Sequence, residues 1–117
     1  MNRLLIVSAL LLSGCAAKPV LLQPGAESVR IGKNDPEPGF VYVGEVSGAS
    51  GNGCWLYGSQ GSFGESAKAL RNEAFALGAD YVQIMSETRP GLRGTTEAGC
   101  YQNTYRIDGT AYKASSR

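Results

Sequence analysis

One segment of the chain has the periodicity of an amphipathic helix, and this single helix limits the folds that are open to the chain. Across residues 65–77 the apolar side chains return every three or four positions and form one stripe. Ser62 and Glu65 have the spacing of an N-terminal capping box, and Gly78 stands where a left-handed C-terminal cap belongs. The stripe is rich in alanine, so we expect the helix to lie close to a sheet. It consists of Ala67, Leu70, Ala74 and Leu77.

The segments on either side of this helix have the composition of strands. In residues 40–47 and 79–87, successive side chains alternate between two faces, as in a strand, and many of them are aromatic or β-branched. Residues 28–31 form a shorter candidate strand. Residues 102–114 predict a last strand or hairpin, interrupted at Asp108-Gly109 by a tight turn or a bulge. The order strand, helix, strand, strand predicts an α+β domain, with one helix packed on a small, mostly antiparallel sheet.

The N-terminus has the parts of a bacterial lipoprotein signal. Arg3 precedes an apolar run over residues 4–12, and Leu12-Ser13-Gly14-Cys15 follows the pattern of a lipobox. This nine-residue run, broken only by Ser8, is too short to span a bilayer core, which needs about 20 residues. We therefore predict a signal peptide over residues 1–14 and a lipid on Cys15, with no other cofactor. The residue after Cys15 is not aspartate, so the outer membrane, on its periplasmic face, is the expected location.

This prediction divides the chain into four parts. Residues 15–27 form the lipidated N-terminus and a short tether, residues 28–114 form the domain, and residues 115–117 form a polar tail. About a dozen residues then separate the lipid from the domain, and when extended they reach roughly 40 Å. The acyl chains would hold the domain to outer-membrane lipid.

Charge and composition exclude several functions. Arg3 is one of 11 Lys and Arg residues, so the predicted mature chain keeps 10 of them against 10 Asp and Glu. A neutral chain lacks the positive charge that nucleic-acid binding requires. The chain has no histidine, which excludes a histidine-containing catalytic triad and the commonest transition-metal ligand. No metal site and no catalytic residues are predicted.

The two remaining cysteines, Cys54 and Cys100, most simply form a structural disulfide, because the periplasm is oxidising. A reactive thiol pair is the alternative, but the chain has no Cys-x-x-Cys spacing to support it. Two thiolates alone would also provide too few ligands for a metal.

Two loops carry the candidate surface for a partner. The glycine-rich loop over residues 48–64 contains Trp55 and Tyr57, which either cover the core or face a partner. The polar loop over residues 88–99 contains Arg89 and Arg93, which either meet an anionic surface or are simply solvated.

Two stretches resemble a known family. Residues 39–46, GFVYVGEV, and residues 70–83, LRNEAFALGADYVQ, are similar to small bacterial outer-membrane lipoproteins related to RcsF, the sensor of the Rcs envelope-stress relay. The resemblance implies a disulfide-stabilised periplasmic α+β domain without enzymatic activity. It also implies contact with barrel proteins and signalling to an inner-membrane partner. The family's usual cysteines are replaced here by Phe40 and Ala114, so Cys54 and Cys100 would form a different bridge.

Three functions follow as hypotheses. The first is a binding or envelope-sensing module that contacts a barrel protein or an envelope regulator. The second is a structural accessory subunit of an envelope complex. The third is an enzyme, which the scattered Asp and Glu residues support least, because a pair such as Glu65 and Glu73 has no partner group in the sequence.

Overall fold

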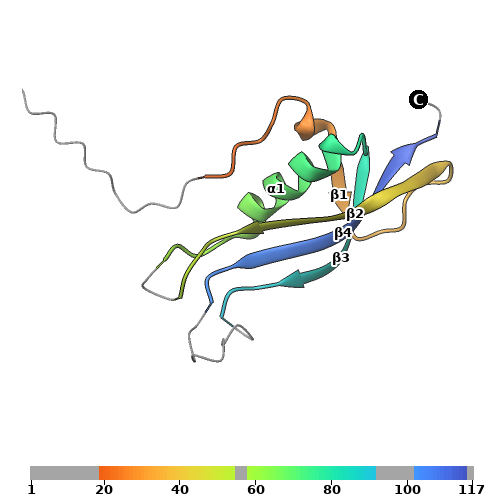
Figure 1. Ribbon diagram of the computed structural model, residues 1–117. Helices are drawn as coiled ribbons and strands as arrows, with labels where there is room; N and C mark the ends of the chain where they lie inside the picture. Colours follow the sequence, from red (N-terminus) through yellow and green to blue (C-terminus); the bar gives the residue numbers. More distant parts are fainter. Residues whose placement is uncertain (1–18, 55–57, 92–101, 116–117) are drawn as a thin grey trace, which may run out of the picture.

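The computed structural model describes residues 19–54, 58–91 and 102–115, and it shows one helix lying across one face of a four-stranded sheet (Figure 1). This arrangement confirms the predicted α+β class. The elements in chain order are a 3-10 turn η1 (Ala26–Ser28), β1 (Arg30–Gly32), β2 (Phe40–Ser50), α1 (Phe63–Ala76), β3 (Tyr81–Thr88) and β4 (Tyr105–Ala114).

The strands lie in the order β1-β3-β4-β2, so the two last strands of the sequence occupy the centre of the sheet. β4 pairs antiparallel with both β2 and β3, whereas the short β1 pairs parallel with β3. The sheet is therefore mostly antiparallel, as predicted. The chain passes from one edge strand, β1, to the other, β2, before it enters α1.

β4 runs without interruption through Asp108-Gly109, where a turn or bulge was expected. The irregularities lie instead on its neighbours, between Tyr42 and Gly44 in β2 and between Ile84 and Ser86 in β3. A Cβ at position 109 would lie only 2.7 Å from the Gln83 carbonyl oxygen. Because Gly109 has no side chain, the bulged strand β3 can lie this close to β4.

The caps at Ser62 and Gly78 form where the sequence predicts them, although the helix spans Phe63–Ala76 instead of residues 65–77. The Ser62 hydroxyl oxygen accepts a hydrogen bond from the Glu65 amide at 3.2 Å. At the other end, Gly78 has a φ of 76° and its amide donates to the Phe75 carbonyl at 2.9 Å, while the Ala79 amide donates to the Ala74 carbonyl at 3.0 Å. These two bonds are those of a Schellman cap.

The inner face of α1 is made of small residues, which bring the helix close to the sheet. Ser66, Ala67, Leu70 and Ala74 are buried, whereas Leu77, expected in this stripe, is 46% exposed because it follows the last helical residue. Opposite them stands Gly48 of β2, where a Cβ would overlap the Ser66 carbonyl oxygen and the Leu70 amide nitrogen. The helix backbone therefore rests directly on the β2 backbone. The remaining core side chains are Val29, Val46, Ala79, Val82, Tyr105, Ile107 and Ala111.

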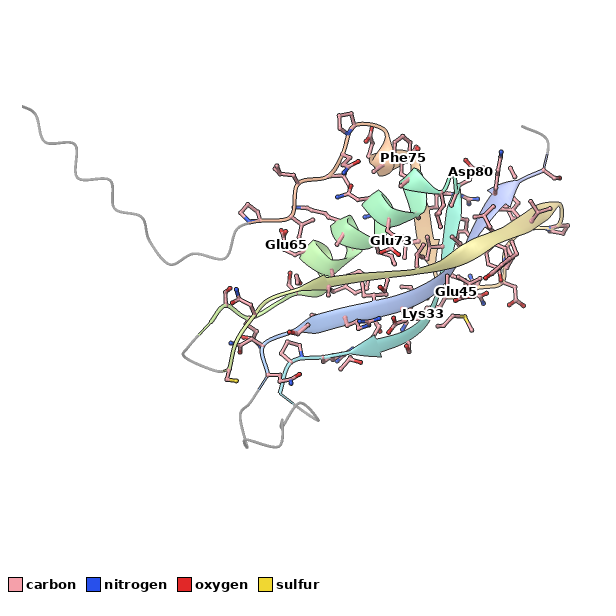
Figure 2. The ribbon with its side chains drawn as sticks, in the orientation of Figure 1. Lys33, Glu45, Glu65, Glu73, Phe75 and Asp80 are labelled. Atoms are coloured by element: carbon pink, nitrogen blue, oxygen red, sulfur yellow. The ribbon has the colours of Figure 1, made fainter. Side chains whose placement is uncertain are left out.

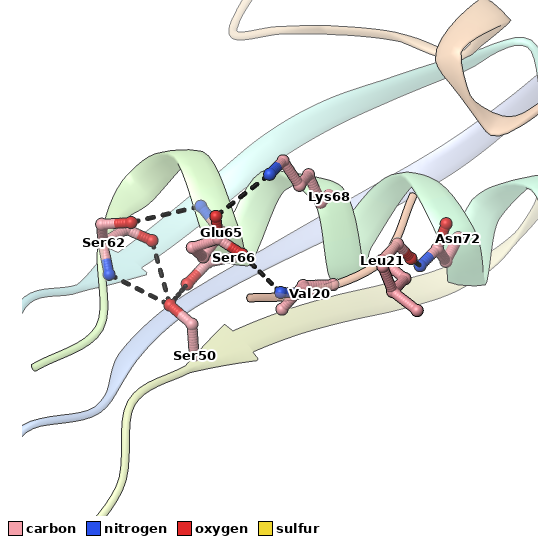
Figure 3. Close-up of polar contacts among 8 residues, drawn as sticks. All are labelled: Val20, Leu21, Ser50, Ser62, Glu65, Ser66, Lys68 and Asn72. Atoms are coloured by element: carbon pink, nitrogen blue, oxygen red, sulfur yellow. Dashed lines mark hydrogen bonds and ion pairs between the residues drawn. The ribbon is translucent and has the colours of Figure 1, made fainter. Parts of the chain in front are cut away.

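Three serines hold the start of α1 to the sheet (Figure 3). The Ser50 hydroxyl at the end of β2 accepts from the Ser62 amide at 3.0 Å and lies 2.7 Å from the Ser66 hydroxyl. The fully buried Ser66 donates to the Tyr105 carbonyl at 2.8 Å. The ends of β2, α1 and β4 are thus joined by hydrogen bonds that satisfy polar groups in the interior.

We predict that Gly48→Ala destabilises the domain by about 1–3 kcal/mol, because the added methyl forces the helix backbone away from β2. Urea unfolding measured by circular dichroism would give the change. Gly64→Ala is the matched control, since nothing lies within 4 Å of a Cβ there. That control should gain about 0.5 kcal/mol from the lost flexibility of glycine. Equal effects of the two substitutions would contradict the close helix–sheet contact.

Candidate functional site

Residues 19–25, which we call the strap, run along the outer side of α1, away from the sheet (Figure 1). The Val20 amide donates to the Glu65 carboxylate at 2.5 Å, in the first turn of the helix (Figure 3). At the other end of the strap, a Cβ at Gly25 would stand 2.6 Å from the Phe75 ring, in the last turn. The strap therefore follows the helix from its first turn to its last.

Asn72 binds the middle of the strap at two points. Its side-chain nitrogen donates to the Leu21 carbonyl at 2.7 Å, and its side-chain oxygen accepts from the Gln23 amide at 2.8 Å. An asparagine side chain offers one donor and one acceptor in fixed geometry, so it satisfies both backbone groups at once. The neighbouring Arg71 donates to the Val29 carbonyl at 3.0 Å and holds the chain just beyond the strap.

The charge of Glu65 strengthens this attachment. The hydrogen bond from the Val20 amide, followed by the hydrogen bond from Lys68 at 3.0 Å, lowers the pKa of the Glu65 carboxyl below its ordinary value of 4.5. Desolvation acts in the opposite direction but is smaller. Glu65 was expected to complete the capping box with Ser62. Its side chain instead turns to the strap, while the Ser62 amide binds Ser50.

The docked strap changes the expected domain boundary. Residues 15–27 were predicted to be a lipidated N-terminus and a tether, but from Val20 onward the chain is held against α1. Five residue steps then separate Cys15 from Val20, and when extended they reach about 18 Å instead of roughly 40 Å. Residues 15–18 lie outside the described part of the chain.

The glycine-rich loop and the segment between β3 and β4, which begins with the expected polar loop, meet at one end of the sheet, which we call the loop end (residues 51–54, 58–62, 89–91 and 102–104). Asn103, which is buried and lies beyond the expected polar loop, joins this segment to the glycine-rich loop. Its amide donates to the Gly53 carbonyl at 3.1 Å and its carbonyl accepts from the Gly61 amide at 2.7 Å. Its side-chain nitrogen donates to the Asn52 carbonyl at 3.2 Å. The same asparagine therefore contacts both halves of the glycine-rich loop.

Cys54 also belongs to the loop end. It forms an isolated antiparallel bridge with Gln102 and is disulfide-bonded. Cys100, its predicted partner, lies outside the described residues, so the identity of the pair stays a prediction.

Arg89 is exposed and lies beside a buried polar contact. The Tyr105 hydroxyl donates to Glu87 at 3.2 Å, and Glu87 also pairs with Lys33 at 3.8 Å. Burial raises the pKa of the Tyr105 hydroxyl, the bond to Glu87 raises it further, and the Arg89 charge acts weakly in the opposite direction. Arg89 is thus placed at the loop end, as expected. Trp55, Tyr57 and Arg93 lie outside the described residues, as does the lipid-attachment residue Cys15.

Sequence reasoning missed the residues that hold the strap and the loop end. Asn72 lies outside the predicted apolar stripe, and its contacts lie 49 and 51 residues away along the chain. Asn103 precedes the last strand and has no local pattern that distinguishes it from a turn residue. The one available signal was that Arg71 and Asn72 adjoin the buried Leu70 in the stretch that resembles other lipoproteins.

Two hollows open on the described surface. One of about 330 Å³ lies at the end of α1, between Phe75, Asp80 and Lys113. Another of about 190 Å³ lies beside β1, between Arg30, Asp35 and Tyr81. Within the described ranges, no three acidic, cysteine or histidine side chains gather in a way that could hold a metal ion. No helix in that part of the chain is long and apolar enough to cross a membrane.

We predict that Asn72→Ala frees the strap while the domain stays folded. Removing two hydrogen bonds, each worth about 0.5–1.5 kcal/mol, should raise thermolysin cleavage at Leu21 or Leu22 about tenfold. Mass spectrometry of the cleavage products would measure this rate. Glu73→Ala, at the exposed neighbouring position, is the control and should leave the rate unchanged. An equally slow cleavage of both variants would contradict the attachment.

The lowered pKa of Glu65 predicts that acid loosens the strap. The carboxylate form accepts the Val20 bond, so the stabilisation is complete above pH 4.5 and is lost as the pH falls through the lower pKa of the folded state. Cleavage of the strap by pepsin should therefore accelerate below pH 4.5. In Glu65→Gln this acceleration should be reduced, and an unchanged pH profile would show that Glu65 does not hold the strap.

Comparison with known proteins places the chain in a family. It matches the family described as a domain of unknown function (DUF4156) over residues 20–114, which include the strap. It is 33% identical over 92 residues to "Uncharacterized protein YjeI" of Escherichia coli K12, covering 75% of this chain and 76% of the relative. The proteins of the same name from Escherichia coli O6:H1 and Shigella flexneri match equally. No solved structure matches the chain significantly. The chain belongs to the DUF4156 family.

Proposed function

We propose that this chain is an outer-membrane lipoprotein, lipidated at Cys15, whose periplasmic domain is a non-enzymatic binding or envelope-sensing module. Its partner is a barrel protein or an envelope regulator, and its contact surface is the loop end. One observation carries the proposal: the strap enters the domain at the end of α1 that adjoins the loop end.

Hydrogen bonds of the first turn of α1 bring the strap and the loop end to the same end of the helix. Val20 binds Glu65 in the first turn of α1, three residues after the Ser62 cap that closes the glycine-rich loop. Ser66, in the same turn, binds the first residue of β4, which follows the second loop. A lipid on Cys15 would therefore hold the first turn of α1, beside the loop end, within about 18 Å of chain from the membrane surface. Proteins embedded in that membrane would be the nearest partners.

The loop end is also held in place before any partner binds. Asn103 joins the segment between β3 and β4 to the glycine-rich loop, and the disulfide at Cys54 restrains the glycine-rich loop. A surface that is already ordered loses less conformational entropy on binding, so a small contact area can give useful affinity.

Three of the described carboxylates are already engaged in contacts within the fold. Glu65 holds the strap, Glu87 accepts from Tyr105, and Asp108 pairs with Arg106 at 3.0 Å. Each is engaged in a contact that stabilises the fold, which leaves it poorly suited to act as a general acid or base.

The proposal is tested by photo-crosslinking in the native cell. A photoreactive residue is placed in the full-length lipoprotein at Trp55 and Arg93, in the two loops that adjoin the loop end in the sequence, and, as a control on the outer side of α1, at Glu73. We expect discrete adducts with one envelope protein from Trp55 and Arg93 and none from Glu73. We also expect Cys15→Ser to lose both the outer-membrane fractionation and the adducts.

Adducts from Glu73 alone would contradict the loop end as the contact surface. Adducts from all three positions, with a fixed stoichiometry on purification, would favour the structural accessory subunit instead. Correct outer-membrane fractionation of Cys15→Ser would contradict the lipid anchor.

A further inference from the structure

The face of the sheet opposite α1 carries a row of three tyrosines on β3, β4 and β2, which Arg30 continues on β1. Arg30 of β1 is in register with Tyr81 of β3, Tyr81 with Tyr112 of β4, and Tyr112 with Tyr42 of β2. Paired residues of adjacent strands point to the same side of a sheet. Val82 and Ala111, the next residues along β3 and β4, are fully buried in the core beneath α1. The tyrosines therefore lie on the face opposite α1, which we call the open face. There Tyr81 is buried and donates to the Asn34 carbonyl, Tyr112 is half-buried and Tyr42 is exposed.

The edge of this row is available to a ligand. Tyr42 is 60% exposed, although large aromatic side chains are usually buried. Its ring contacts Tyr112 edge-on, at 6.4 Å between ring centres and 77° between planes. An edge-to-face contact holds the ring in position and leaves most of its surface uncovered.

The adjacent row across the same face is polar and made for hydrogen bonding. Gln83, Thr110 and Glu45 are in register on β3, β4 and β2. The Thr110 hydroxyl donates to the Glu45 carboxylate at 3.2 Å, and the Gln83 amide donates to Asp35 at 3.1 Å. Figure 2 shows Glu45 on the side of the sheet away from Glu65 and Glu73. An amide, a hydroxyl and a carboxylate thus lie directly beside the tyrosine row.

The cations of this face are already neutralised. The Arg30 guanidinium pairs with Glu37 at 3.2 Å and lies 5.7 Å from the centre of the Tyr81 ring. Arg106 pairs with Asp108 at 3.0 Å. Glu45 and Asp35 add negative charge to the same face, so an anionic ligand is disfavoured there and a ligand that binds through stacking and hydrogen bonds needs no paired charge.

The hollow of about 190 Å³ beside β1 continues the row at Tyr81 and is lined by Arg30, Asn34, Asp35 and Glu37. It is smaller than the pockets of roughly 300–1,000 Å³ that enclose whole drug-sized ligands. It therefore suits one unit of a longer ligand whose other units lie along Tyr112 and Tyr42.

We infer that the open face of the sheet is a binding site for a neutral glycan chain. A sugar ring presents C–H bonds on its faces and hydroxyl groups around its rim. Tyr42 and Tyr112 provide the aromatic surface for the former, and Gln83, Thr110 and Glu45 provide hydrogen-bond partners for the latter. This site lies on a different surface from the loop end and does not depend on the proposed lipid anchor.

The test titrates the ¹⁵N-labelled full chain in detergent with chitotetraose, cellotetraose and maltotetraose and follows the backbone amides by NMR. We expect saturable shifts with at least one of these sugars, confined to the amides around Tyr42, Tyr112 and Thr110. Tyr42→Ala should weaken the affinity about threefold to tenfold, whereas Tyr42→Phe should retain it, because stacking uses the ring.

Phe63→Ala is the matched control. Phe63 is 44% exposed and contacts a tyrosine of β4 edge-on at 6.1 Å, as Tyr42 does, but this tyrosine is Tyr105 and belongs to the core on the α1 side. This variant should bind sugar like the unmodified chain.

Three results would overturn the inference. The first is that none of the three sugars shifts these amides up to its solubility limit. The second is that Tyr42→Ala and Phe63→Ala reduce the affinity equally. The third is that the open-face amides broaden with protein concentration in the absence of sugar, and that Tyr42→Ala removes this effect. The last result would assign the face to a second copy of the chain. Crosslinking from the loop end is measured separately, so the two proposals fail independently.

Discussion

The direct contact between the backbones of α1 and β2 is the constraint on which the rest of the structure depends. It exists because Gly48 has no side chain and because the helix presents serine and alanine to the sheet. The helix is thereby held close to β2 and β4, and its first turn is joined to both strands through Ser50 and Ser66. This packing fixes the distance of the helix from the sheet, and the strap binds to the outer side of the helix, which faces away from the sheet.

The same packing separates the two surfaces of the molecule. On the α1 side, Glu65 and Asn72 hold the chain that leads to the predicted lipid, and Asn103 holds the loop end together nearby. Within the described part of the chain, the opposite side of the sheet has no helix, and Tyr42 at the edge of the tyrosine row is exposed there while Tyr81 is buried. A lipid-anchored domain built in this way would present the loop end towards its own membrane. The open sheet face would remain available for a second ligand.

Local features were predictable from the sequence, and distant hydrogen bonds were not. Ser62 and Gly78 delimit the helix through bonds to residues a few positions away, so their patterns are visible in the sequence. Asn72 acts on backbone groups about 50 residues away, and an asparagine on the polar side of a helix looks the same whether it binds a strap or water. The parallel pairing of β1 with β3 likewise depends on the path of the whole chain.

The candidate site was predicted in part for the same reason. The two loops were chosen for their composition, whereas Asn103, which lies beyond the expected polar loop and has no distinguishing pattern, holds the glycine-rich loop to the segment between β3 and β4. Arg89 is found at this end, while Trp55, Tyr57, Arg93 and Cys100 lie outside the described residues. The resemblance to RcsF-related lipoproteins stays a prediction, because the comparisons concern the DUF4156 family and YjeI.

Amide hydrogen exchange at Val20 and Gln23 tests most directly whether the strap is part of the fold. Both amides donate to side chains of α1, so in the full-length chain near neutral pH they should exchange markedly more slowly than in an unstructured peptide of the same sequence. Exchange at the unstructured rate would contradict the docked strap. The predicted lipid on Cys15 would then be separated from the domain by a free tether.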